Sequence, residues 1–244
     1  MKLEVKNLVK KFKSTIAVNN ISFEIDKNKT LGLLGPNGCG KTTSIGMMLG
    51  LITPSSGEVF IDGMPLNSKN RIKLLSFMNF ASPYIELPKK LTVIQNLEVY
   101  ARLYGVNKKT ERIEELIEDL NLKKFLYKKT GELSSGQKNR VSLAKSLINK
   151  PKILFLDEPT ASLDPDIGDF VRKYIEEYKA KHNISILLAS HNMREVERLC
   201  DKVIMMKEGK IVDRGTCKSL IEKHGRNNLE DTFLKLARNK NELE

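Results

Sequence analysis

Short apolar runs, separated by segments of helical periodicity, make up most of the 244-residue chain. Residues 30–34, 153–156 and 184–189 are almost wholly apolar, as expected of strands covered on both faces in a parallel sheet. Segments compatible with helices lie between or after these runs, at 43–51, 165–180 and 193–199. This alternation predicts an α/β fold with a mostly parallel sheet.

The N-terminal part of the chain has a shorter hydrophobic period. Strands are predicted at 3–9, 17–25 and 58–61, and a basic turn at 10–14 joins the first two. These strands are expected to form an antiparallel β subdomain. Between 71 and 90 the pattern predicts a strand followed by an irregular loop.

From residue 90 to 150 the pattern is helical throughout. Thr92 followed by Gln95 is a capping box, and the helix that it starts is predicted to reach Leu103. A second helix at 110–120 places its large aliphatic side chains on one face, namely Ile113, Leu116, Ile117 and Leu120. We interpret 90–150 as an α-helical insertion in the α/β core.

The last part of the chain completes the domain. Asp164 followed by Pro165 predicts a helix start, with an N-cap and then proline at the first helical position. A hairpin is expected around Glu208-Gly209. The organisation expected is one domain at 1–217, with an α/β core at 1–89 and 151–217 and a helical subdomain at 90–150, followed by a short helical tail at 218–244.

One stretch implies a chemistry through its residue order alone. After the run 30–34 the chain continues in the pattern GxxxxGKT with Gly35, Pro36, Asn37, Gly38, Cys39, Gly40, Lys41, Thr42 and Thr43. Glycines let successive N–H groups converge on one anion, and the following helix adds its positive end. Lys41 would reach β- and γ-phosphates, and the Thr42 hydroxyl would ligate Mg²⁺. The alternative, a glycine-rich turn that binds nothing, is disfavoured by the strand, loop and helix context.

Two carboxylates follow the apolar run 153–156. They fall at the carboxyl edge of the predicted parallel sheet, where such folds bind ligands. Asp157 is predicted to hold Mg²⁺, directly or through water, and Glu158 to polarise a water molecule as a general base. A plain acidic loop before Pro159 is the alternative, and the phosphate loop upstream disfavours it.

A second helix start has two interpretations. Ser134 and Gln137 form another capping box, within the segment 133–137. The same serine- and glycine-containing start also presents amides and a positive dipole end to an anion. Taken alone, the residues favour the capping role.

Composition adds a strong positive charge, with 42 Lys and Arg against 30 Asp and Glu, a net +12. This charge suits nucleic acid, an anionic membrane surface or acidic partners, and equally a lysine-rich solvated surface. Only 6% of residues are aromatic, and no basic run is interleaved with stacking rings, so nucleic-acid binding is not expected. The three cysteines, Cys39, Cys200 and Cys217, have no metal-ligand spacing and are expected to be free thiols.

Several motifs together resemble a known family. The phosphate loop, 133–137, 153–158, Ser162-Leu163-Asp164 and Ser190-His191 occur in the order and approximate spacing of the ATP-binding cassette (ABC) ATPases, the motor subunits of ABC transporters. The resemblance covers about residues 3–215. It implies a P-loop NTPase core, ATP and Mg²⁺ as cofactors, and a head-to-tail dimer. Each ATP would lie between the phosphate loop of one subunit and the signature segment, 133–137, of the other.

The resemblance also implies roles for single residues. Phe12, for which composition alone favours packing against the core, matches the aromatic that stacks on adenine. The γ-phosphate contacts of the signature segment match Ser134, Ser135, Gly136 and Gln137. Asp164 matches the loop that communicates between the two sites, and His191 matches the switch histidine that senses the γ-phosphate.

The sequence departs from the family pattern at two places. Ser135 stands where the family usually has glycine, and the added hydroxymethyl group is small enough to preserve binding. The family's glutamine loop should fall between Phe77 and Pro88, but that stretch contains no glutamine. Asn79 is the nearest amide and is the expected substitute as a metal ligand.

The expected function is therefore that of an ATP-hydrolysing subunit driving separate transmembrane subunits, either as a homodimer or with a second cassette. With no signal peptide and no apolar spanning stretch, the chain is expected in the cytoplasm, on the inner face of the membrane through its partner. Residues 192–201 resemble the branch that includes drug and other export systems. The alternatives are a soluble cassette ATPase acting on ribosomes or nucleic acid, and a non-hydrolysing regulatory cassette.

Overall fold

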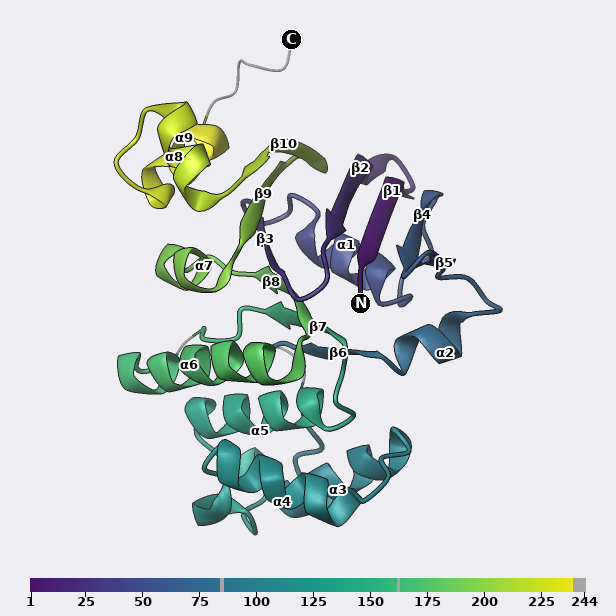
Figure 1. Ribbon diagram of the computed structural model, residues 1–244, viewed down its shortest axis with the longest axis vertical. Coiled ribbons are helices and arrows are strands. Elements are labelled where there is room, and N and C mark those ends of the chain that lie inside the picture. Colours follow the sequence, from purple (N-terminus) through teal and green to yellow (C-terminus); the bar gives the residue numbers. More distant parts are fainter. Residues whose placement is uncertain (84–85, 162, 239–244) are drawn as a thin grey trace. The chain divides into compact units, whose positions relative to one another are not determined.

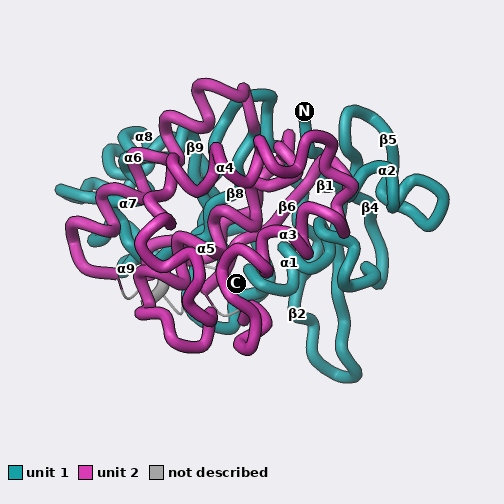
Figure 2. Tube along the Cα trace, turned by 90° about the horizontal axis from the view of Figure 1, so that it is seen from below, with its two compact units in different colours: residues 1–75, 185–244 teal, residues 76–184 magenta. Residues whose placement is uncertain are grey.

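A computed structural model describes residues 1–83, 86–161 and 163–238, and Figure 1 shows the elements. The chain forms two compact units. Unit 1 contains residues 1–75 and the described part of 185–244, and unit 2 contains residues 76–184, as coloured in Figure 2. Strands β6 and β7 and helix α6 (bounds below) are thus grouped with the helices between residues 90 and 150.

Unit 1 contains the antiparallel sheet that the N-terminal pattern predicts. Its strands are β1 (Leu3–Phe12), β2 (Thr15–Ile25), β4 (Ser56–Ile61) and β5 (Met64–Pro65), in the order β2-β1-β4-β5. The expectation of a basic turn over 10–14 was wrong in extent. Lys10, Lys11 and Phe12 continue β1 and pair with Val18, Ile16 and Thr15, because the backbone can pair with β2 while these side chains remain at the surface.

The other strands of unit 1 form a buried, mostly parallel sheet. β3 (Thr30–Leu34) lies between β8 (Ser185–Ala189) and β9 (Lys202–Lys207) and runs parallel to both. Every residue of β3 and β8 is buried, which explains their unbroken apolar sequences. β10 (Lys210–Gly215) pairs antiparallel with β9 through the predicted hairpin, whose turn residues Glu208 and Gly209 both have positive φ.

Five described helices belong to unit 1: α1 (Lys41–Met48), α2 (Arg71–Leu75), α7 (Met193–Leu199), α8 (Cys217–His224) and α9 (Leu229–Arg238). The short helix α2 lies where the sequence indicated no helix. The tail helices are part of the core, because Leu220 and Leu229 are buried in one cluster with Leu34 and Val196. Apolar burial of this kind holds the tail against the sheet.

Unit 2 pairs two parallel strands, β6 (Met78–Ala81) and β7 (Ile153–Asp157), with Ala81 opposite Leu156. Its α-helices are α3 (Val93–Leu103), α4 (Lys109–Asp119), α5 (Ser135–Leu147) and α6 (Pro165–His182), and two 3₁₀ turns occupy Lys123–Phe125 and Thr130–Glu132. Both predicted capping boxes are present, at the starts of α3 and α5. Asp164 is the N-cap residue of α6, but its side chain makes no capping hydrogen bond.

A buried arginine ties the helices of unit 2 together. The Arg112 guanidinium on α4 forms an ion pair with Glu115, donates to the carbonyl of Leu147 at the end of α5 (2.6 Å), and donates to the hydroxyl of Tyr178 on α6 (3.0 Å). Leaving these buried partners unpaired would cost several kcal/mol, about 3–5 by analogy with other buried pairs. Among the described residues, no helix combines the length and hydrophobicity needed to cross a bilayer.

Candidate functional site

The loop between β3 and α1 is built for an anion. Gly40, the N-cap of α1, has φ 106° and no side-chain cap. A Cβ there would lie 2.4 Å from the carbonyl oxygen of Ala17 on β2. A Cβ at Gly35 would lie 2.5 Å from the carbonyl oxygen of Met206 on β9. Only glycine fits this close approach, so the first amides of α1 have no side chain over them.

Lys41 lies within this loop rather than in solvent, with 9% of the residue exposed. Its ammonium donates to the carbonyl of Gly35 at 2.5 Å and to that of Pro36 at 3.2 Å. Carbonyl oxygens are weaker partners for a cation than a phosphate is. The ammonium is therefore held beside the glycines, and Thr42 follows it in the first turn of α1 with an exposed side chain.

Cys39 lies against the same loop. The residue is 3% exposed, and a Cβ on Gly35 would lie 2.4 Å from its sulfur. Its sulfur is 4.0 Å from the Lys41 ammonium. Burial raises the pKa of the Cys39 thiol, and the nearby Lys41 charge opposes this. The thiol is consequently less reactive than an exposed one.

His191 follows β8 as the phosphate loop follows β3. The two strands are parallel neighbours, with Leu33 opposite Ala189, so both segments leave the same edge of the sheet. The turn is fixed because the Ser190 hydroxyl donates to Glu195 at 2.6 Å and accepts from the amide of Asn192 at 3.1 Å. His191 itself is exposed at this edge.

Phe12 lies at the end of β1 and is 47% exposed. This exposure contradicts the packing against the core that composition alone favours, and it is compatible with the stacking role that the family resemblance implies. The Lys10 ammonium lies 4.9 Å from the ring centroid and donates to the carbonyl of Thr53 at 2.7 Å. The aromatic ring is therefore on the surface of unit 1, where a planar ligand can stack on it.

In unit 2 the acidic pair ends β7 as predicted. Asp157 is half-buried and Glu158 has φ 51°, a left-handed conformation that a residue with a side chain adopts only at some cost. The next residue is held in place because the Asn139 amide on α5 donates to the carbonyl of Pro159 at 2.6 Å. The hydroxyl of Ser82, directly after β6, donates to Asp157 Oδ2 at 3.4 Å.

Asn79, the expected amide ligand, is engaged elsewhere in unit 2. It lies within β6, and its amide donates to Asn149 Oδ1 at 2.9 Å and accepts from the backbone N–H of Phe80 at 2.9 Å. Ser82, which the sequence reasoning missed, contacts Asp157 instead. The sequence signal for Ser82 was its place directly after the strand that became β6, because residues at the carboxyl ends of parallel strands often bind ligands.

The start of α5 is satisfied by its own side chains. The Ser134 hydroxyl accepts from the Gln137 amide at 3.3 Å, and the Gln137 side chain accepts from the Ser134 amide at 3.1 Å. Ser135 is exposed, whereas Gly136 is buried, and a Cβ on it would lie 3.0 Å from Ile167 of α6. In the predicted motif Ser162-Leu163-Asp164, Ser162 lies outside the described residues.

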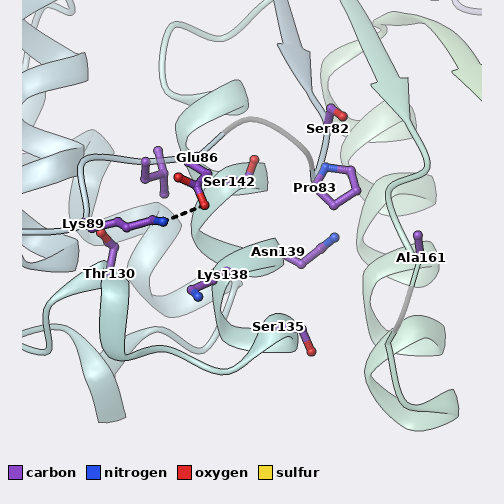
Figure 3. Close-up of a pocket in the computed structure, with 11 residues that line it drawn as sticks. Ser82, Pro83, Glu86, Lys89, Thr130, Ser135, Lys138, Asn139, Ser142 and Ala161 are labelled. Carbon is purple, nitrogen blue, oxygen red and sulfur yellow. Dashed lines mark ion pairs between the residues drawn. The ribbon is translucent and has the colours of Figure 1, made fainter.

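A cavity of about 340 Å³ within unit 2 joins two of the predicted segments. Figure 3 shows Ser82 and Pro83 on the side of Asn139 and Ala161, with the Glu86–Lys89 ion pair (2.8 Å) across from them. Ser135 of the signature segment lines the same cavity. Residues directly after β6 and residues of α5 therefore line the same cavity in unit 2.

The predicted metal donors have suitable chemistry. Thr42 offers a hydroxyl and Asp157 a carboxylate, both hard oxygen ligands. Mg²⁺ is usually held by one or two such groups together with the phosphates of its substrate. Each of the two donors, taken by itself, therefore has the chemistry of a ligand for Mg²⁺ bound as its nucleotide complex.

A glycine cradle and a lysine at an uncapped helix start, after a buried parallel strand, define a P-loop nucleotide-binding protein, and the acidic pair after β7 is typical of the ATPases of that class. A profile of the ABC transporter family matches residues 18–161. The chain belongs to this family, as an ATP-binding subunit with ATPase activity.

Individual relatives agree with this assignment. The chain is 36% identical over 230 residues to the ABC transporter ATP-binding protein NatA of Bacillus subtilis, covering 91% of both chains. It is 35% identical over 222 residues to the Nod factor export ATP-binding protein I of Burkholderia orbicola, covering 90% of this chain and 72% of that protein. A solved ATP-binding subunit of an ABC transporter superimposes with a TM-score of 0.88 at 26% identity, covering 98% of this chain and all of the other.

Proposed function

We propose that this protein binds ATP with Mg²⁺ between two cassettes and uses its hydrolysis to drive separate transmembrane subunits, in the direction of export. The observation that carries the proposal is the phosphate loop, in which glycines leave the amides of α1 without a side-chain cap and hold Lys41 beside them. An anion with several oxygens can accept from these donors at once.

Unit 1 supplies the binding of the nucleotide. The α1 amides and Lys41 hold the β- and γ-phosphates, and the ammonium exchanges its two carbonyl partners for phosphate oxygens. Phe12 stacks on the base from the surface of β1. His191, at the same sheet edge as the loop, donates to the γ-phosphate.

The catalytic step depends on the two carboxylates at the end of β7, Asp157 and Glu158. Mg²⁺, when bound, neutralises charge that develops on the phosphates. Thr42 and Asp157 would hold it. Glu158, the residue directly after Asp157, accepts a proton from the attacking water.

The signature segment supplies the second set of contacts. The Ser134 hydroxyl caps α5 in the structure, so it must divide its hydrogen bonds between the helix and a γ-phosphate from the other cassette. The γ-phosphate is present only before hydrolysis, so ATP favours the paired state more than ADP does. Hydrolysis then releases the two cassettes.

Coupling to a membrane partner is supported by helix α3. Three large apolar side chains on or just after it, Val99, Leu103 and Tyr104, are exposed, which is typical of a surface that binds another protein. Export is supported by the similarity to the Nod factor export ATP-binding protein I and by the motif at 192–201. The transport assignment of the relatives disfavours the ribosome-directed and regulatory alternatives.

The test is Glu158→Gln, which retains the shape of the side chain and removes the base. Purified E158Q is expected to form a stable dimer with Mg-ATP in size-exclusion chromatography, and the double variant E158Q/K41M is expected to remain monomeric. If E158Q stayed monomeric under saturating Mg-ATP, at concentrations where ATP binding is measured directly, the proposed dimer with ATP between two cassettes would be refuted.

A further inference from the structure

Two parallel strands of unit 2 end with a polar contact that the proposed mechanism leaves unused. β6 and β7 pair in register with Ala81 opposite Leu156, so the next residues, Ser82 and Asp157, leave the sheet side by side. Ser82 is only 4% exposed, and its hydroxyl lies 3.4 Å from Asp157 Oδ2. A backbone ladder thus fixes both ends of this hydrogen bond.

The direction of this hydrogen bond is set by chemistry. An ionised carboxylate only accepts, so the hydroxyl hydrogen of Ser82 is the one donated. A donor fixed by the strand restricts rotation of the carboxylate about its terminal bond. Groups that orient a ligating carboxylate in this way typically change metal affinity about 10–100-fold when removed.

We propose that Ser82 is a positioning residue for the metal of the nucleotide complex and acts through Asp157. The inference rests on the proposed Mg²⁺-dependent function. This role falls to Ser82 and not to Asn79, which lies three residues earlier, within β6. The Asn79 amide already makes hydrogen bonds with Asn149 Oδ1 and the backbone N–H of Phe80. The role of Ser82 would connect the loop after β6 to the metal through Asp157, because Ser82 is the first residue of that loop and lines the 340 Å³ cavity.

The experiment compares two variants of equal size. Ser82→Thr keeps the hydroxyl and adds a methyl group. Ser82→Val has nearly the same volume as threonine, but a methyl group stands in place of the hydroxyl. Binding of Mn²⁺ to the full-length protein with saturating ATP is measured by electron paramagnetic resonance, and ATP affinity is measured separately in EDTA. We expect S82V to weaken Mn²⁺ binding about tenfold, S82T to stay within about twofold of the natural protein, and ATP affinity in EDTA to be unchanged in both.

Controls separate the possible failures. Ser142→Ala removes a hydroxyl from the same cavity and is expected to leave Mn²⁺ binding unchanged. Equal Mn²⁺ affinities for S82V and S82T, whether normal or reduced, would overturn the role of the hydroxyl. If S82V does not fold, Ser82→Ala removes the hydroxyl without adding volume, and the same criterion applies to it against S82T. Should the natural protein bind ATP with no Mn²⁺ at all, the proposed function itself would fail.

Discussion

Helices α1 and α5 both begin at segments predicted to bind phosphate, yet their first turns are built differently. Helix α1 begins after Gly40, which has a left-handed backbone and no capping side chain. Helix α5 begins after Ser134, whose capping box with Gln137 satisfies two amides reciprocally. One helix start is open to a ligand, and the other is already satisfied by its own residues.

This difference implies a division of labour. An uncapped helix start loses the stability that a cap gives, about 1 kcal/mol, and retains its donors for an incoming anion. A capped start is stable alone, so an anion there must compete with the cap. The phosphate loop therefore has free donors for an anion in a single cassette, whereas under the proposed function the signature segment would add its contacts only when a second cassette brings a γ-phosphate to it.

The largest effect is expected at Lys41. Lys41→Met removes the cation from the open helix start, and ATP affinity should fall by about 100-fold or more, because a charge-assisted contact with phosphate is lost. The unfolding temperature without nucleotide should change little, because methionine loses the two hydrogen bonds to loop carbonyls but also removes the desolvation cost of a buried ammonium. Isothermal titration and thermal unfolding measure the two quantities. A variant that loses stability along with affinity would show that Lys41 is structural.

A second prediction compares two glycines of the same loop. Gly40→Ala places a methyl group 2.4 Å from the Ala17 carbonyl, whereas Gly38→Ala meets no atom within 4 Å and suffers only from its φ of 79°. We expect G38A to lose about 1–2 kcal/mol of unfolding free energy, the usual strain of a left-handed residue. G40A should lose more and should also lose ATP binding, because the loop must move. Chemical denaturation measures the difference, and equal losses would mean that the close approach is not rigid.

At the capped helix start the expected effect is smaller and of another kind. Ser134→Ala removes the hydroxyl that caps α5, so the unfolding free energy should fall by about 1 kcal/mol. ATP affinity of the single cassette should not change, while hydrolysis that depends on dimerisation should fall about tenfold or more. Ser134→Thr keeps the cap and is the matched control. A loss of ATP affinity by the monomer of S134A would contradict the division of labour.

Several of these features were readable from the sequence because their physics is local. The capping boxes at Thr92 and Ser134, the buried strands and the hairpin at Glu208-Gly209 depend on neighbouring residues, and the structure confirms them. Ser82 was missed because its place after a strand was not enough to single it out: its contact with Asp157 comes from the register of β6 with β7, which joins residues 75 positions apart. The extent of β1 was missed for a similar reason, since pairing with β2 carries the strand through Lys10, Lys11 and Phe12, where the sequence indicated a turn.

The smallest effect concerns Cys39, the thiol of the open helix start. Only thiolate reacts with maleimide, and because burial raises the pKa of Cys39, less thiolate exists at neutral pH than in an exposed cysteine. Labelling should therefore be slow at pH 7 and continue to accelerate above the pH at which ordinary thiols level off. Bound ATP should slow it further in the Cys200→Ala/Cys217→Ala background, and equally so in S134A, since protection needs only the phosphate loop. Labelled protein that still bound ATP normally would place the thiol away from the phosphates, and protection that required Ser134 would show that the two helix starts do not act separately.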